Sequence, residues 1–196
     1  MKYFTSDWHF GEDRLGITGK PNLFYRPFKS VEQQNQFIYD SFVDSEFKDG
    51  DELWHLGDVA FSLNDETRRY LQMLRNKYPN SRFNLIVGNY DEDNLAELRN
   101  YFDTIQDQTS LFIGETNYYL NHYPIKCKTA LEVDSTLPVP CYDFAITGHI
   151  HGLWKVQKQM VNVGVDAWHF KPVSETMIDF AMNACKKFYD DNVFPY

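Results

Sequence analysis

Short groups of Asp, Asn and His recur along this chain, and each follows directly after a segment that the sequence predicts to be a β-strand. The groups are Asp7-Trp8-His9, Gly57-Asp58, Gly88-Asn89-Tyr90-Asp91, Asn121-His122 and Gly148-His149-Ile150-His151. In α/β sheets, loops converge outside the carboxyl ends of the strands, and ligands bind there. We therefore expect the five groups to meet in space, which requires a fold that brings these strand ends together.

The predicted elements alternate between strand and helix in the first half of the chain and become strand-rich afterwards. Strands are expected at 2–6, 52–56, 82–87, 104–108, 110–113, 117–121, 142–147 and 153–165, and helices from residue 30 and at 64–77, 94–102 and 174–187. Ser30 with Gln33 forms a capping box, and Asn64 is expected to cap the second helix. Two irregular segments, 11–29 and 128–140, are predicted to be long loops.

This pattern is typical of an α/β fold with mixed sheets covered by helices. No repeat, low-complexity stretch or linker divides the sequence, so we expect a single domain over residues 1–196. The three cysteines, Cys127, Cys141 and Cys185, lie far apart, which favours a reducing compartment. With no apolar leader and no run long enough to cross a bilayer, we expect a soluble cytoplasmic protein without a membrane partner.

The acidic composition limits the possible partners. The chain has 19 Lys and Arg against 28 Asp and Glu, a net charge of −9, which repels a phosphate backbone and disfavours nonspecific nucleic-acid binding. Bound divalent cations would weaken that argument. Imidazoles and carboxylates together suit Mn, Fe, Ni or Zn, so the recurring groups predict a metal site. His55 belongs to a strand itself, and we expect it to be a packed residue.

The ordered set of groups resembles the five-motif signature of the calcineurin-like metallophosphoesterases, and in particular their compact microbial branch. The matching motifs are Asp7-x-His9, Gly57-Asp58, Gly88-Asn89-x-Asp91, His122 and Gly148-His149-x-His151. The resemblance implies two mixed β-sheets packed as a sandwich and flanked by helices in four layers. It also implies a metal-dependent phosphoric ester hydrolase, either a phosphodiesterase or a phosphatase.

The resemblance further implies two divalent ions per chain, with Mn²⁺ as the first expectation and Fe, Ni or Zn as alternatives. One ion would be held by Asp7, His9, Asp58 and His151, and the other by Asp58, Asn89, His122 and His149. A hydroxide bridging the ions would attack a small phosphodiester or phosphomonoester directly. The catalytic residues implied are Asp58, Asn89, Tyr90 and Asp91.

Two departures from the family's pattern affect this expectation. Phe61 stands where the second motif usually has Asp, and Tyr90 stands where the third motif usually has His. That His is generally assigned to leaving-group or transition-state contacts, so the proton donor is left open. Tyr90 transfers a proton less readily than an imidazolium, and it could instead form a wall for an aromatic ester group.

Two residues outside the motifs are candidates for substrate binding. Arg26 lies in the first long loop, and Arg suits bidentate phosphate contacts, although a solvated surface position is the alternative. His169 is a second candidate of the same kind.

Two other functions remain alternatives at this point. One is a nuclease acting on nucleic-acid ends, which the net charge of −9 disfavours. The other is a non-catalytic scaffold on the same fold, which is disfavoured because all seven ligand positions hold metal-competent side chains. The sequence leaves open the natural substrate, the metal and the oligomeric state.

Overall fold

The structure is a computed structural model that describes residues 1–12, 14, 26–124, 143–157 and 159–188. Cys127, Cys141, the predicted loop at 128–140 and most of the predicted loop at 11–29 lie outside the described residues. Ten strands in the described part of the chain form two five-stranded sheets, and both sheets contain parallel and antiparallel neighbours.

The first sheet contains the early strands of the chain in the order β10-β1-β2-β3-β4. These are β1 (Lys2–Thr5), β2 (Glu52–His55), β3 (Arg82–Ile86), β4 (Thr104–Gln106) and β10 (Val173–Ser174). β1 to β4 run parallel, and β10 pairs antiparallel with β1. The sequence does not predict β10, because two residues are too few to show an alternating pattern.

The second sheet has the order β5-β6-β7-β9-β8. Its strands are β5 (Gln108–Ile113), β6 (Thr116–Asn121), β7 (Phe144–Thr147), β8 (Val156–Gln157) and β9 (Met160–Asn162). The predicted hairpin of β5 and β6 is confirmed. The single strand predicted at 153–165 is wrong, because β8 and β9 pair antiparallel as separate strands and a 3₁₀ helix, η2 (Val165–Ala167), follows them.

The helices are α1 (Val31–Val43), α2 (Asp65–Lys77), α3 (Leu95–Leu98), which the 3₁₀ helix η1 (Glu92–Asn94) precedes, and α4 (Glu175–Phe188). The first two begin directly after their predicted capping residues. Ser30 accepts a hydrogen bond from the Gln33 N–H, and Asn64 accepts one from the Thr67 N–H. In the described residues, every helix is too short or too polar to cross a lipid bilayer.

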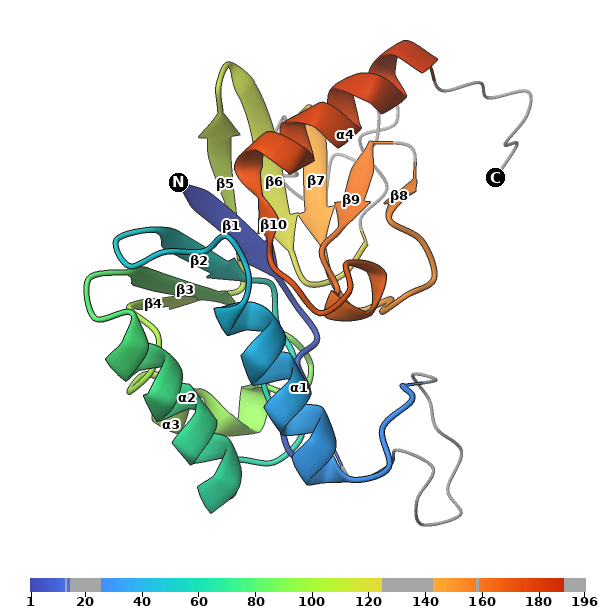
Figure 1. The fold of residues 1–196 in the computed structure, drawn as a ribbon. Coiled ribbons are helices and arrows are strands. Elements are labelled where there is room, and N and C mark those ends of the chain that lie inside the picture. Colours follow the sequence, from blue (N-terminus) through green and yellow to red (C-terminus); the bar gives the residue numbers. More distant parts are fainter. Residues whose placement is uncertain (13, 15–25, 125–142, 158, 189–196) are drawn as a thin grey trace.

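Helices α1 and α2 lie against one face of the first sheet, and the second sheet lies on its other side (Figure 1). Two clusters of buried apolar side chains fill these two interfaces. One packs side chains such as Leu53 against Ile38 of α1 and the neighbouring α2. The other joins Phe4 of the first sheet to Leu120 of the second and is completed by Ile178 of α4. The expected α/β fold of two mixed sheets packed as a sandwich, with helices against it, is confirmed.

Candidate metal centre

The predicted polar groups come together where the two sheets adjoin. Backbone hydrogen bonds make this junction: the Ser6 N–H donates to the Val163 carbonyl, and the Val165 N–H donates to the Ser6 carbonyl, each at 3.1 Å. Ser6 therefore ties the end of β1 to the segment that follows β9. The segments that follow β6 and β7 are also joined, because the Gly148 N–H donates to the His122 carbonyl at 3.0 Å.

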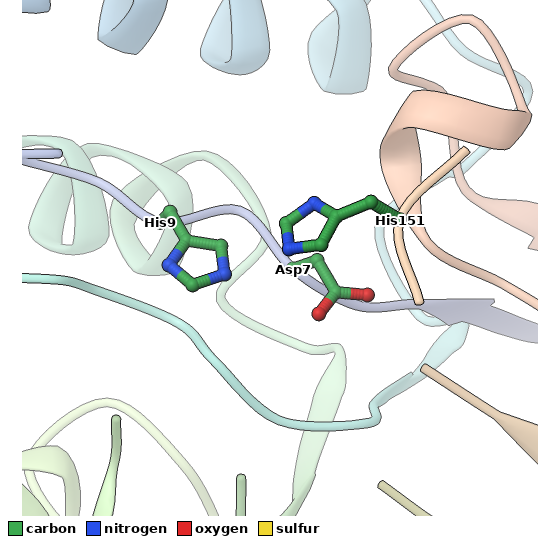
Figure 2. Close-up of side chains that lie close together, drawn as sticks. All are labelled: Asp7, His9 and His151. Carbon is green, nitrogen blue, oxygen red and sulfur yellow. The ribbon is translucent and has the colours of Figure 1, made fainter. Parts of the chain in front are cut away.

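Six of the seven predicted metal ligands form two groups of three. The first group is Asp7, His9 and His151, and the second is Asp58, His122 and His149. Within each group, one ligand atom from each residue lies within 4.8 Å of the others. Figure 2 shows the first group, with Asp7 and His9 on the segment after β1 and His151 on the loop after β7. Each group thus takes side chains from both sheets.

Asp58 belongs to the second group and also lies close to the first. Its Oδ2 atom is 3.4 Å from Nε2 of His9 and also 3.4 Å from Nε2 of His122. The seventh predicted ligand, Asn89, lies beside the second group, with its Oδ1 atom 3.2 Å from Nε2 of His122. The position of Asp58, close to a histidine of each group, is the one that a carboxylate shared by two ions requires.

Hydrogen bonds to Nδ1 leave Nε2 as the ligand atom of two histidines. Nδ1 of His122 lies 2.7 Å from the Leu56 carbonyl, and Nδ1 of His151 lies 2.7 Å from Oδ2 of Asp166. A carbonyl or carboxylate oxygen only accepts, so each Nδ1 carries the proton. Such outer contacts orient histidine ligands in metal sites.

Five of the seven predicted ligands have left-handed backbone conformations. Their φ angles are 60° at Asp7, 49° at His9, 59° at Asp58, 72° at His149 and 51° at His151. Residues other than glycine rarely adopt these angles, and such conformations cluster at functional sites. The surrounding fold therefore holds these residues in conformations that are unfavourable on their own.

Glycines at the same strand ends allow the close packing of the ligand loops. A Cβ atom on Gly88 would lie less than 3.0 Å from both Oδ1 and the backbone N of Asp58. A Cβ atom on Gly57 would lie 2.5 Å from Nδ1 of His122. At both positions a side chain would displace a predicted ligand.

The electrostatics of the centre suit a divalent cation. Burial raises the pKa of the Asp7 carboxyl, which is fully enclosed. Burial also holds the pKa of His9 well below its usual value, so its imidazole is neutral. At His122 burial alone would lower the pKa, but the Asp58 carboxylate raises it to about 9. Two buried carboxylates with neighbouring imidazoles form a donor set that fits divalent metal ions.

Asp91 belongs to neither ligand group and bonds to the backbone of the loops that carry the ligands. It is 1% exposed, and its carboxylate accepts hydrogen bonds from the backbone N–H groups of Asp58, Gly88 and Val59 at 2.8, 2.9 and 3.0 Å. Burial raises the pKa of this carboxyl to about 6, although the backbone donors oppose the shift. Asp91 therefore joins the loops after β2 and β3, and this geometry favours a positioning role over the predicted catalytic one.

Arg26 is buried, and its guanidinium is bonded within the protein. Its five N–H groups donate to Asp166 (twice), to Gln34 and to the backbone carbonyls of Asp7 and Trp8, and the residue is 3% exposed. All five N–H groups of the guanidinium are thus bonded within the protein, which disfavours the predicted phosphate contact, and that assignment stays a prediction. The alternative of a solvated surface position is wrong, because the residue is buried.

Asp166 is the functional residue that the sequence reasoning missed. It accepts hydrogen bonds from both Arg26 and His151, and burial alone would raise its pKa, but the Arg26 guanidinium lowers it to about 2. His169 is exposed and belongs to neither ligand group, so its assignment to substrate stays a prediction. His55 is fully buried with its ring 4.4 Å from that of Trp8, which confirms the expected packing role.

No family model matches the chain, and no curated protein matches it by sequence. Among solved structures, it is similar to a protein of unknown function from Aquifex aeolicus, with 26% identity, a TM-score of 0.67 and coverage of 92% of this chain and 98% of that one. It is also similar to Yfce, a phosphoesterase from E. coli, with 15% identity, a TM-score of 0.45 and coverage of 83% and 77%. A third similar structure is the Pseudomonas putida nuclease MPE, with 17% identity, a TM-score of 0.45 and coverage of 76% and 60%.

Proposed function

We propose that this chain is a metallophosphoesterase of the calcineurin-like superfamily that hydrolyses small phosphate esters with two divalent metal ions. The observation that carries the proposal is the position of Asp58, whose Oδ2 atom lies 3.4 Å from a histidine of each ligand group. The order of the motifs over residues 7–151 supports the same assignment.

The ligands are proposed as two sets that share Asp58. One set is Asp7, His9, Asp58 and His151, and the other is Asp58, Asn89, His122 and His149. When bound, the ions would supply an activated water and neutralise charge on the phosphoryl oxygens. Leu56 and Asp166 keep the protons of His122 and His151 on Nδ1, so that both Nε2 atoms face the centre.

The finer features of the proposal follow from the sequence. We propose Mn²⁺ as the metal, with Fe, Ni or Zn as alternatives, and a phosphodiester or phosphomonoester as substrate. One domain over residues 1–196 and a cytoplasmic location belong to the same proposal.

The test is hydrolysis of bis(p-nitrophenyl) phosphate and p-nitrophenyl phosphate by metal-depleted protein to which Mn²⁺, Ni²⁺, Zn²⁺ or Mg²⁺ is returned. We expect two bound ions per chain and activity that depends on them. Asp58→Asn should abolish hydrolysis, whereas Asp65→Asn, at an exposed position on α2, should not change it. Hydrolysis by the metal-depleted protein, or full activity of Asp58→Asn, would contradict the proposal.

The same assay separates the alternatives. Cleavage of a single-stranded oligonucleotide with neither nitrophenyl ester hydrolysed would favour a nuclease. Binding of two ions without hydrolysis of any ester would favour a non-catalytic scaffold.

A further inference from the structure

A small cluster that includes no predicted metal ligand lies beside the first ligand group. It consists of Glu12, Arg14, Phe61 and Tyr90, and we call it the Arg14 cluster. The Arg14 guanidinium donates from Nε to Oε1 of Glu12 at 2.8 Å and from Nη2 to Oε2 at 2.7 Å. Nη2 also donates to the Tyr90 hydroxyl at 2.9 Å, and Cζ lies 4.5 Å from the centroid of the Phe61 ring. These contacts fix the guanidinium in one orientation.

Tyr90 connects the Arg14 cluster to the centre. Its ring meets the His9 ring edge-on, with the centroids 5.0 Å apart, and its backbone N–H donates to Oδ1 of Asp58 at 3.0 Å. Tyr90 therefore links Arg14 to both ligand groups, contacting His9 through its ring and Asp58 through its backbone N–H.

The Arg14 cluster still has hydrogen-bond donors to offer. Nε and Nη2 of Arg14 are engaged, but Nη1 has no acceptor among the residues that the structure describes. The Tyr90 oxygen accepts from Arg14, which leaves its own proton to donate. The Arg14 side chain is 22% exposed, so a ligand can reach it. In contrast, Arg26 has all of its donors bonded within the protein.

The charge of the Arg14 cluster limits which ligand it suits. The Glu12 carboxylate is fully buried and lies directly against the guanidinium, so the pair has no net charge. Directed N–H and O–H donors suit phosphoryl oxygens in general. A neutral pair, however, adds little attraction for a second negative charge, such as a monoester carries above its second pKa of about 6.

We propose that Arg14, held by Glu12 and Tyr90, binds the phosphoryl group of the substrate and makes the centre selective for singly charged phosphodiesters over doubly charged phosphomonoesters. This inference rests on the proposed function and names the substrate class of the same centre. Arg14 is the binding residue, and Glu12 acts through it.

The first test is Arg14→Gln in the manganese-loaded protein. We expect KM for bis(p-nitrophenyl) phosphate to rise about tenfold or more while kcat changes less, because a contact made with bound substrate is lost. Affinity for inorganic phosphate, measured by calorimetry, should fall by a similar factor with the metal content unchanged. The matched control is Arg68→Gln, which breaks a similar bidentate Arg–Glu pair with Glu97 outside both ligand groups.

The second test is Glu12→Gln, which keeps the size of the side chain and removes its charge. With Arg14 unopposed, the ratio of kcat/KM for bis(p-nitrophenyl) phosphate to that for p-nitrophenyl phosphate at pH 8 should fall severalfold. The double variant Glu12→Gln with Arg14→Gln should show no such fall relative to Arg14→Gln alone, which distinguishes a charge effect from a packing defect.

The results separate this inference from the proposed function. If the wild-type protein hydrolyses neither ester with any metal, the proposed function fails. If it hydrolyses them but Arg14→Gln leaves KM and phosphate affinity unchanged, or Glu12→Gln leaves the ratio unchanged, this inference alone is overturned.

Discussion

Oδ2 of Asp166 accepts a hydrogen bond from Nδ1 of His151 across 2.7 Å, although His151 follows β7 and Asp166 lies in η2. The same carboxylate accepts two hydrogen bonds from Arg26, which also donates to the Asp7 carbonyl. A single buried guanidinium thus positions two of the three residues of the first ligand group.

Replacement of Asp166 should weaken the first ligand group. In Asp166→Asn, a neutral amide replaces the charged acceptor that keeps the proton of His151 on Nδ1. Hydrogen-bond partners of this kind, which contact a ligand and not the metal, contribute about 10–100-fold to metal affinity. Calorimetric titration of the metal-depleted protein with Mn²⁺ should show one ion retained and one weakened by that factor. Asp65→Asn serves as the control, and an unchanged titration of Asp166→Asn would contradict the prediction.

Loss of the Arg26 side chain should lower the stability of the fold more than it lowers substrate affinity. Arg26→Ala leaves the buried Asp166 carboxylate without its cation, and breaking a buried ion pair on one side destabilises by about 3–5 kcal/mol. Urea denaturation followed by tryptophan fluorescence measures this free energy of unfolding. A raised KM with an unchanged urea denaturation midpoint would instead support the predicted role of Arg26 in substrate binding.

A methyl group at Gly88 should disable the centre. Its Cβ would lie less than 3.0 Å from Oδ1 and N of Asp58, so Gly88→Ala should reduce metal content and hydrolysis together. Gly152→Ala is the matched control, because the nearest atom to its Cβ would be the Asp166 Cβ at 3.6 Å, an ordinary contact. Equal metal content in both variants and in the wild-type protein would show that the loops tolerate the methyl group.

Removal of the Asp91 side chain should be costly because three buried N–H groups lose their acceptor. At about 1–3 kcal/mol for each unsatisfied group, Asp91→Ala should lower the free energy of unfolding by about 3 kcal/mol or more. Asp49→Ala, which removes an acceptor for Asn80 at an exposed position, should have a much smaller effect. A stable but inactive Asp91→Ala variant would favour the catalytic role that the motif implied.

The placement of the ligands was predictable because it depends on local patterns. Strand ends can be found from short apolar runs, and parallel strands bring those ends to one edge, so Asp7, Asp58 and Asn89 could be placed together in advance. The helix starts at Ser30 and Asn64 were predictable for a similar reason, since a capping side chain bonds only two or three residues away.

The contacts that hold the ligands in place were not predictable. Arg26 and Asp166 are 140 positions apart, and their pairing depends on how the two sheets dock. The left-handed backbone at His149 and His151 could not be predicted either, because histidine adopts this conformation more often than most residues but still only in a small minority of cases.

Because each ligand group contains residues from both sheets, an ion bound there would hold the two sheets together. Ions that bind the folded chain and not the unfolded one stabilise it by mass action, by about 2.7 kcal/mol at a free concentration one hundred times Kd. Chelation of such ions should therefore weaken the junction of the two sheets at Ser6 and Gly164. As the free metal concentration rises or falls, we expect resistance to proteolysis at that junction and catalytic activity to change together.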